Sequence, residues 1–285
     1  MNKLDLPVKA WYDAIFVRHS RRTYLSAPLT DNEVLQLKRV CDRFRPFPEA
    51  RAELVLEPPD KVFKGLIGAY GKVKGAPSYI AFIGDLSSQR VHEAVGYTGE
   101  GIILEATSMG LATCWVGGFF RPEQVAAHLT LGRGEKVLAV TPVGHAPDDP
   151  SPEEKVIKRL VSSHRRKPLD HIARGFSKTS PEWMRRALEA ARLAPSALNR
   201  QPWRFSVESE SITVSVTAPD GISGISSRLD CGIAMLHLEL GALLSGVRGV
   251  WDFLAPPTVA RYTKAHDLCN TDTSSMLLSG MVVPH

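Results

Sequence analysis

Hydrophobic positions along the chain recur with a helical spacing in some stretches and with a strand-like spacing in others. The helical spacing predicts helices at 9–17, 91–109, 122–131, 180–192 and 228–245, and after the capping box Thr30-Asp31-Asn32-Glu33. The strand-like runs predict strands at 53–57, 78–84, 111–116, 136–143, 203–208, 212–217, near Val250 and at 276–283. A further helix is predicted from Pro257. Long helices interleaved with strands are typical of a layered α+β or α/β fold rather than a helical bundle.

The order of predicted elements repeats, which predicts two halves, residues 1–175 and 176–285. The proline-rich stretch 147–152 is interpreted as a loop within the first half, and the boundary is expected near residues 175–179. Residues 99–112 and 230–243 hold the same place in each half. They share only the pairs Gly101/Gly232, Ile102/Ile233 and Gly110/Gly241, so the repeat depends mainly on matched element order.

Composition narrows the class of protein. The chain has 285 residues, enough for one large or two smaller domains, with 44% hydrophobic and 23% charged residues, as in ordinary globular proteins. The net charge of +5 is not gathered into one stripe, so we expect no nucleic-acid partner. No apolar segment resembles a secretory signal or spans a bilayer comfortably, so no membrane partner is expected. Four widely spaced cysteines without a CxxC pair fit free thiols in a reducing compartment, by default the cytoplasm. The histidines lack metal-ligand spacing, so no metal is expected.

A basic turn near the N-terminus, RHSRR at residues 18–22, has the chemistry to hold a phosphate. Arg18 offers a fork of charged donors and Ser20 a hydroxyl, and their two-residue spacing lets both face one anion, with Arg22 next along. His19 lies between them. Taken alone, such a turn is also compatible with a solvated basic surface.

A second motif, APSALNRQPW at residues 194–203, lies in the other half of the chain. Two prolines rigidify it, and Ser196 and Asn199 supply polar groups, although both could simply cap their own backbone. The two motifs together resemble the paired FMN-binding elements of the nitroreductase family. In that family the flavin lies at a homodimer interface, and the resemblance implies flavin contacts from Pro195, Ser196 and Asn199, as well as from Arg18, His19, Ser20 and Arg22.

Further segments extend this resemblance. GLATCWVGGF at residues 110–119 is similar to the segment that passes the flavin ring, which implies contacts from Trp115, Val116, Gly117 and Gly118. A tight turn between the two glycines is the alternative.

The resemblance also identifies positively charged partners for the flavin. RRKPL at residues 165–169 is similar to the family's C-terminal basic segment, which implies that Arg166 returns to the phosphate. Lys72 and Lys74 are candidates for the N1–C2 carbonyl edge of the flavin, and a surface loop explains both nearly as well.

Each half lacks the motif that the other half carries, and the back half ends without its own basic segment. The resemblance therefore implies a single-chain fused dimer, acting as a monomer, with one FMN site. It implies an α+β fold with a mostly antiparallel central sheet flanked by helices, built twice in the chain. It also implies hydride transfer from NAD(P)H through FMN to a nitroaromatic, quinone or similar acceptor, without a catalytic side chain. A dehalogenation or oxidase reaction, or sequestration of FMN without catalysis, remain alternatives.

Overall fold

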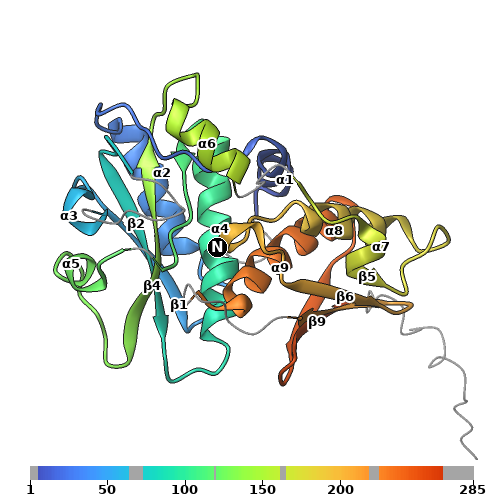
Figure 1. Cartoon of the computed structure of the whole chain (residues 1–285). Helices are drawn as coiled ribbons and strands as arrows, with labels where there is room; N and C mark the ends of the chain where they lie inside the picture. The colour runs from blue at the N-terminus through green and yellow to red at the C-terminus, as the bar shows by residue number, and fades with distance from the viewer. Residues whose placement is uncertain (1–5, 64–72, 119, 161–164, 218–224, 266–285) are drawn as a thin grey trace, which may run out of the picture.

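The computed structural model describes residues 6–63, 73–118, 120–160, 165–217 and 225–265 (Figure 1). Its helices are α1 (Val8–Val17), α2 (Asp31–Arg43), α3 (Asp60–Phe63), α4 (Val91–Ser108), α5 (Pro122–Ala126), α6 (Pro152–Leu160), α7 (Leu169–Ile172), α8 (Glu182–Arg192) and α9 (Ser227–Leu244). Its strands are β1 (Ala50–Val55), β2 (Ser78–Asp85), β3 (Ala112–Thr113), β4 (Glu135–Gly144), β5 (Ala173–Arg174), β6 (Trp203–Val207), β7 (Ser211–Val216), β8 (Gly249–Phe253) and β9 (Thr258–Lys264).

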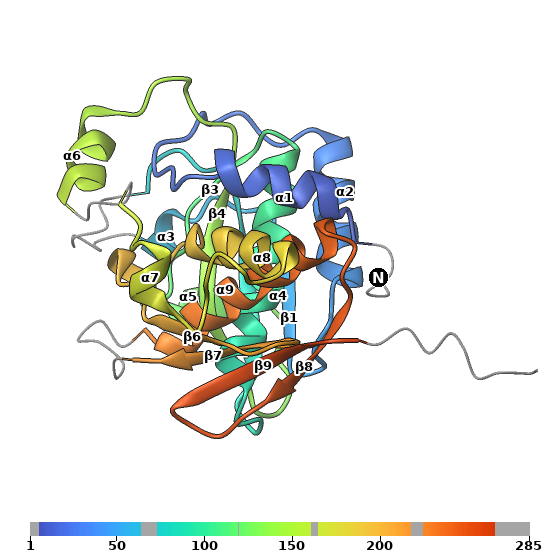
Figure 2. The same cartoon turned by 90° about the vertical axis from the view of Figure 1, so that its right-hand side faces the viewer.

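The strands form two sheets. One has the order β1-β2-β4-β3. The other has the order β5-β6-β7-β9-β8, and Figure 2 shows β6, β7, β9 and β8 side by side. Apart from the short β5, each sheet therefore places its first, second, fourth and third strand side by side, and all those neighbours are antiparallel. The predicted α+β class with mostly antiparallel pairing is confirmed.

The helices α4 and α9 lie between the two sheets and pack closely against each other (Figure 1). Glycines permit this contact, because a Cβ atom on Gly96 would overlap the carbonyl oxygen of Leu229, and one on Gly232 would overlap that of Glu93. The contacts are reciprocal, because Gly96 meets α9 at Leu229 and Gly232 meets α4 at Glu93. None of the helices in the described ranges combines the length and hydrophobicity needed to cross a bilayer.

The predicted strand at 111–116 is shorter in the structure. The strand β3 pairs with β4 through Ala112 and Thr113, and the next residue along β4 is Pro142, which has no N–H for a ladder. The backbone N–H of Cys114 instead donates to the Thr141 hydroxyl at 3.0 Å. Only Cys114 and Trp115 leave the ladder, because Val116 pairs with Val140 of β4 again, and Trp115 forms part of a site.

Two other predicted elements differ. The helix predicted from Pro257 is wrong, because these residues form β9, whose backbone pairs with β7 on one side and with β8 on the other. Its β-branched and aromatic residues favour a strand. The predicted helix at 122–131 ends at Ala126, and Leu129 and Leu131 pack as turn residues against the smaller apolar cluster beneath β2 and β4. The strand predicted at 276–283 lies outside the described residues.

Candidate functional site

A cavity of about 480 Å³ opens between the two sheet-bearing parts of the chain, a volume typical of small-molecule sites. Its wall combines segments that are far apart in the sequence: the end of α1 with the RHSRR turn, Trp115 and Gly117 after β3, α6, Arg166, the loop after α8, and the start of α9. The structure thus brings the first and second sequence motifs to one pocket within a single chain.

The RHSRR turn is fixed beside β3. Helix α1 ends at Val17, and Arg18 adopts an extended backbone. Ser20 then forms a parallel bridge with Thr113, and the backbone N–H of Arg21 donates to the Thr113 carbonyl at 2.9 Å. This pairing sets the turn next to the segment that contains Trp115 and Gly117.

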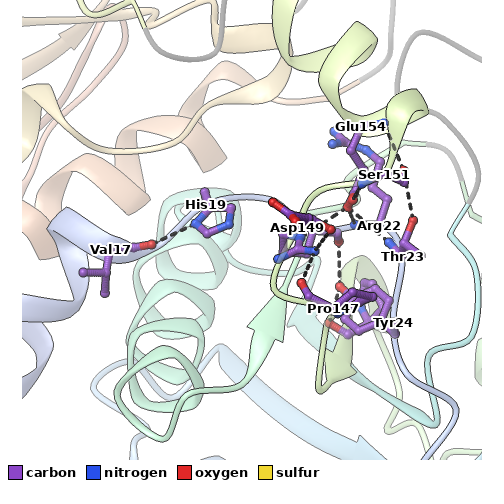
Figure 3. Close-up of polar contacts among 11 residues, drawn as sticks. Val17, His19, Arg22, Thr23, Tyr24, Pro147, Asp149, Ser151 and Glu154 are labelled. Carbon is purple, nitrogen blue, oxygen red and sulfur yellow. Dashed lines mark hydrogen bonds and ion pairs between the residues drawn. The ribbon is translucent and has the colours of Figure 1, made fainter.

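A buried carboxylate, Glu154 of α6, holds the same turn from the other side (Figure 3). It accepts hydrogen bonds from the backbone N–H groups of Arg22 and Thr23 and forms an ion pair with Arg21. Burial raises the pKa of the Glu154 carboxyl, but the hydrogen bonds from the amides of Arg22, Ser151 and Thr23 outweigh it and leave the pKa lowered. Glu154 therefore stays ionised and anchors α6 to the turn.

The loop at 194–203 has an unusual backbone. Leu198, Asn199 and Gln201 have positive φ angles of 51°, 55° and 49°, a region that non-glycine residues seldom adopt. Such residues cost about 1–3 kcal/mol each and cluster at functional sites. The hydroxyl of Ser196 accepts a hydrogen bond from the Gln201 N–H at 2.9 Å, so Ser196 does cap its own loop.

The basic segment 165–167 docks on this loop. Arg166 donates to the Asn199 side-chain oxygen at 3.0 Å, and the Asn199 amide donates to the Arg165 carbonyl at 2.9 Å. The Lys167 ammonium donates to the carbonyls of Arg200 and Gln201. Asn199 and Arg166 thus face the pocket as one hydrogen-bonded unit.

The pocket is electrostatically prepared for an anion. Nη1 of Arg18 is buried without a hydrogen-bond partner among the described residues. Burial, followed by the positive charges of Arg18 and Arg192, lowers the pKa of Arg166 to about 10. Two partly buried guanidinium groups that repel each other are stabilised when an anion binds between them.

Trp115 forms a rigid part of the wall. Its indole N–H donates to the buried carboxylate of Glu100 at 2.7 Å, and the other oxygen of Glu100 pairs with His237 at 2.9 Å. The ring packs on Phe82 and directly over Gly99, where a Cβ atom would overlap it. Nearby, the Gly117 backbone lies against the side chain of Ile225.

Most of the residues named from the sequence meet at this cavity. The pocket wall includes Arg18, His19, Ser20, Arg22, Trp115, Gly117, Arg166, Pro195, Ser196 and Asn199. Two others do not line it: Val116 is buried and bridged to Val140, and Gly118 is exposed nearby. Lys72 lies outside the described residues, and Lys74 forms an ion pair with Glu153 at 2.7 Å.

Sequence reasoning missed several residues of the wall, among them Ile157, Glu154 and Asp230. Ile157 and Glu154 come from α6, and Asp230 comes from α9. A signal for α6 was present, because Ser151 and Glu154 have capping-box spacing, and the structure contains both reciprocal hydrogen bonds. No comparable local pattern marks Asp230.

The chain is similar to known proteins of one family. A model of the family described as "Putative TM nitroreductase" matches residues 10–242. A Thermotoga maritima structure described as a "putative nitroreductase" is 20% identical, with a TM-score of 0.60 over 89% of this chain and 93% of its own. A nitroreductase family protein from Clostridium difficile is 19% identical, with a TM-score of 0.43 over 60% and 98%. A Bacteroides fragilis nitroreductase with bound FMN is 16% identical, with a TM-score of 0.40 over 50% and 90%. No curated protein matches the chain.

The family match spans most of the chain, and the Thermotoga structure shares its fold over nearly its whole length. The chain therefore belongs to the nitroreductase family that this model describes, and it is an oxidoreductase by class.

Proposed function

We propose that the chain is an FMN-dependent oxidoreductase whose pocket holds one flavin. The observation that carries this proposal is the meeting of the RHSRR turn and the strained loop at 194–203 around one cavity, with a buried, unpartnered Arg18 nitrogen in its wall. A phosphate would supply the missing hydrogen-bond acceptor for Arg18 and would compensate the positive charges of Arg18 and Arg166.

The residues divide into two groups. Arg18 and Arg166, with Ser20, Arg22 and His19 beside them, would hold the phosphate and the adjoining part of the cofactor. The second group would bind the ring and its substituents: Trp115, the backbone near Gly117, Pro195, Ser196 and Asn199. Bound FMN supplies the redox chemistry, by which hydride from NAD(P)H reaches a nitroaromatic, quinone or similar acceptor. The chain's own residues would bind and orient the ligands. Trp115 and Ile225 would supply apolar contact surface in the pocket wall.

We also propose that the chain is a fused dimer, with residues 1–175 and 176–285 as its halves. The matched strand order of the two sheets supports this proposal. The reciprocal glycine contacts support it as well, because Gly96 in α4 and Gly232 in α9 lie equally far from the first residue of their helix. The short strand β5, at the end of the proposed first half, pairs with β6 of the second. A monomer would then suffice for function.

One flavin per chain follows from the contents of the second, related position. Ile233, in the pocket wall, follows Gly232 on α9, and Tyr97 follows Gly96 on α4. Tyr97 therefore holds the position that corresponds to Ile233. Tyr97 is fully buried and contacts Phe44 and Phe47, with ring centroids 6.1 Å and 5.1 Å apart, and Phe47 contacts Phe253 at 5.3 Å. Close-packed aromatic rings occupy the space that a second flavin would need.

The cellular setting stays a proposal as well. The three described cysteines, Cys41, Cys114 and Cys231, are buried free thiols, which supports a reducing compartment such as the cytoplasm. Small-molecule substrates, rather than nucleic acid or membrane, are the proposed partners.

The test is a double substitution together with a transient-kinetic measurement. The variant R18A/R166A should fold and lose FMN on purification, whereas the wild type should be yellow. Mixing the wild type with NAD(P)H should bleach the flavin absorbance at a catalytically useful rate. Retention of FMN by the double variant would refute the phosphate assignment. A wild type that binds FMN without bleaching would favour sequestration, and a comparison of nitro, quinone and oxygen acceptors would identify the reaction class.

A further inference from the structure

Asp230 is one of two acidic residues, with Glu154, in a pocket wall that also contains Arg18, Arg22, Lys158 and Arg166. It lies in the first turn of α9, and only 1% of its surface is exposed. A bare carboxylate there would repel a phosphate, so its presence calls for a physical reason.

The carboxylate is bonded to both sides of the strained part of the loop. One oxygen accepts the backbone N–H of Ala197 at 3.0 Å, and the other pairs with the Arg200 guanidinium at 3.1 Å. The same Arg200 nitrogen donates to the Ile225 carbonyl at 3.2 Å. Between Ala197 and Arg200 lie Leu198 and Asn199, both with positive φ.

These contacts hold the loop in a backbone conformation that is unfavourable by itself. The positive-φ residues persist only where the surroundings hold them, and Asn199 is the residue that bonds to Arg166 in the pocket. If the loop relaxed, Asn199 and the adjoining Pro195 and Ser196 would leave the wall, and ligand binding would have to restore the conformation.

We propose that Asp230 and Arg200 are positioning residues that fix the 194–203 loop in its binding shape before the cofactor arrives. This role rests on the proposed FMN function. Arg200 also neutralises Asp230, so the two substitutions differ in effect. Removing the Asp230 charge loosens the loop, whereas removing Arg200 loosens it and leaves the negative charge of Asp230 in the pocket wall without the Arg200 ion pair.

The experiment measures the FMN dissociation constant of the apo protein by fluorescence quenching, and its Tm without ligand. D230N should weaken binding about tenfold, R200Q should weaken it further, and D230N/R200Q should bind better than R200Q alone. The matched control is E93Q, which breaks the buried ion pair between Glu93 and Arg228 near the same end of α9. E93Q should lower Tm and leave FMN affinity within about twofold of the wild type.

The outcomes separate the two proposals. A wild type that binds no FMN would overturn the proposed function and this role with it. If the wild type binds FMN, either of two results would overturn the positioning role alone. D230N would bind FMN as tightly as the wild type, or E93Q would lose as much FMN affinity as D230N. The double variant binding worse than R200Q would contradict the neutralising part of the argument.

Discussion

Arg18 should act in opposite directions on stability and on cofactor binding. In the ligand-free protein its buried Nη1 has no partner among the described residues, and its charge repels Arg166. An unsatisfied buried donor costs about 1–3 kcal/mol. The variant R18A removes that cost, so the apo protein should gain about 2–4 °C in Tm for each kcal/mol relieved.

The same substitution removes a charge-assisted contact to the phosphate, worth about 1.5–3 kcal/mol. The FMN dissociation constant should therefore rise about 10- to 150-fold. R18K, which keeps the charge and loses the fork, should lie between R18A and the wild type.

The assay pairs thermal unfolding of stripped protein, with and without FMN, with a fluorescence titration. R185A is the control, because Arg185 forms an exposed ion pair with Glu182 and should change neither quantity measurably. If R18A lowered the apo Tm and left the FMN affinity intact, Arg18 would be a structural residue and the anion-site reasoning would be refuted.

Three further substitutions test other parts of the account. In the folded protein the pKa of Glu154 is lowered from its ordinary value of 4.5. Its contribution to the free energy of unfolding is therefore complete above pH 4.5 and is lost as the pH falls through the lowered pKa. In urea unfolding, the difference in stability between the wild type and E154Q should shrink in acid. G99A should displace Trp115, weakening FMN binding and changing the near-ultraviolet circular dichroism; an unchanged spectrum would contradict the packing. G96A should cost more than about 4 kcal/mol, because its methyl group meets the Leu229 backbone; a cooperative, wild-type-like melt would contradict the close contact.

Local patterns predicted the parts of the fold that depend on neighbouring residues. The capping box at Thr30 is present with both reciprocal bonds, because its partners are three residues apart. The candidate site residues were chosen through the resemblance to the nitroreductase family, because the RHSRR turn taken alone is also compatible with a solvated basic surface.

Features decided by distant partners were not predictable in this way. The strand β3 ends where Pro142, on another strand, offers no N–H. Residues from Thr258 onward form a strand because β7 and β8 lie on either side of it. Asp230 joins the pocket only because α9 crosses α4 and brings its first turn to the loop. The sequence matched Gly232 with Gly101, whereas the reciprocal close contacts between α4 and α9 involve Gly232 and Gly96.

The most direct test is the amount of FMN bound per chain. The absorbance spectrum of purified protein, combined with quantitation of released flavin and the molar mass in solution, gives this ratio. We predict one FMN per monomeric chain, with the aromatic cluster around Tyr97 closing the related position. A ratio near two, or flavin bound only in an assembly of several chains, would contradict the proposal that one chain builds one complete site.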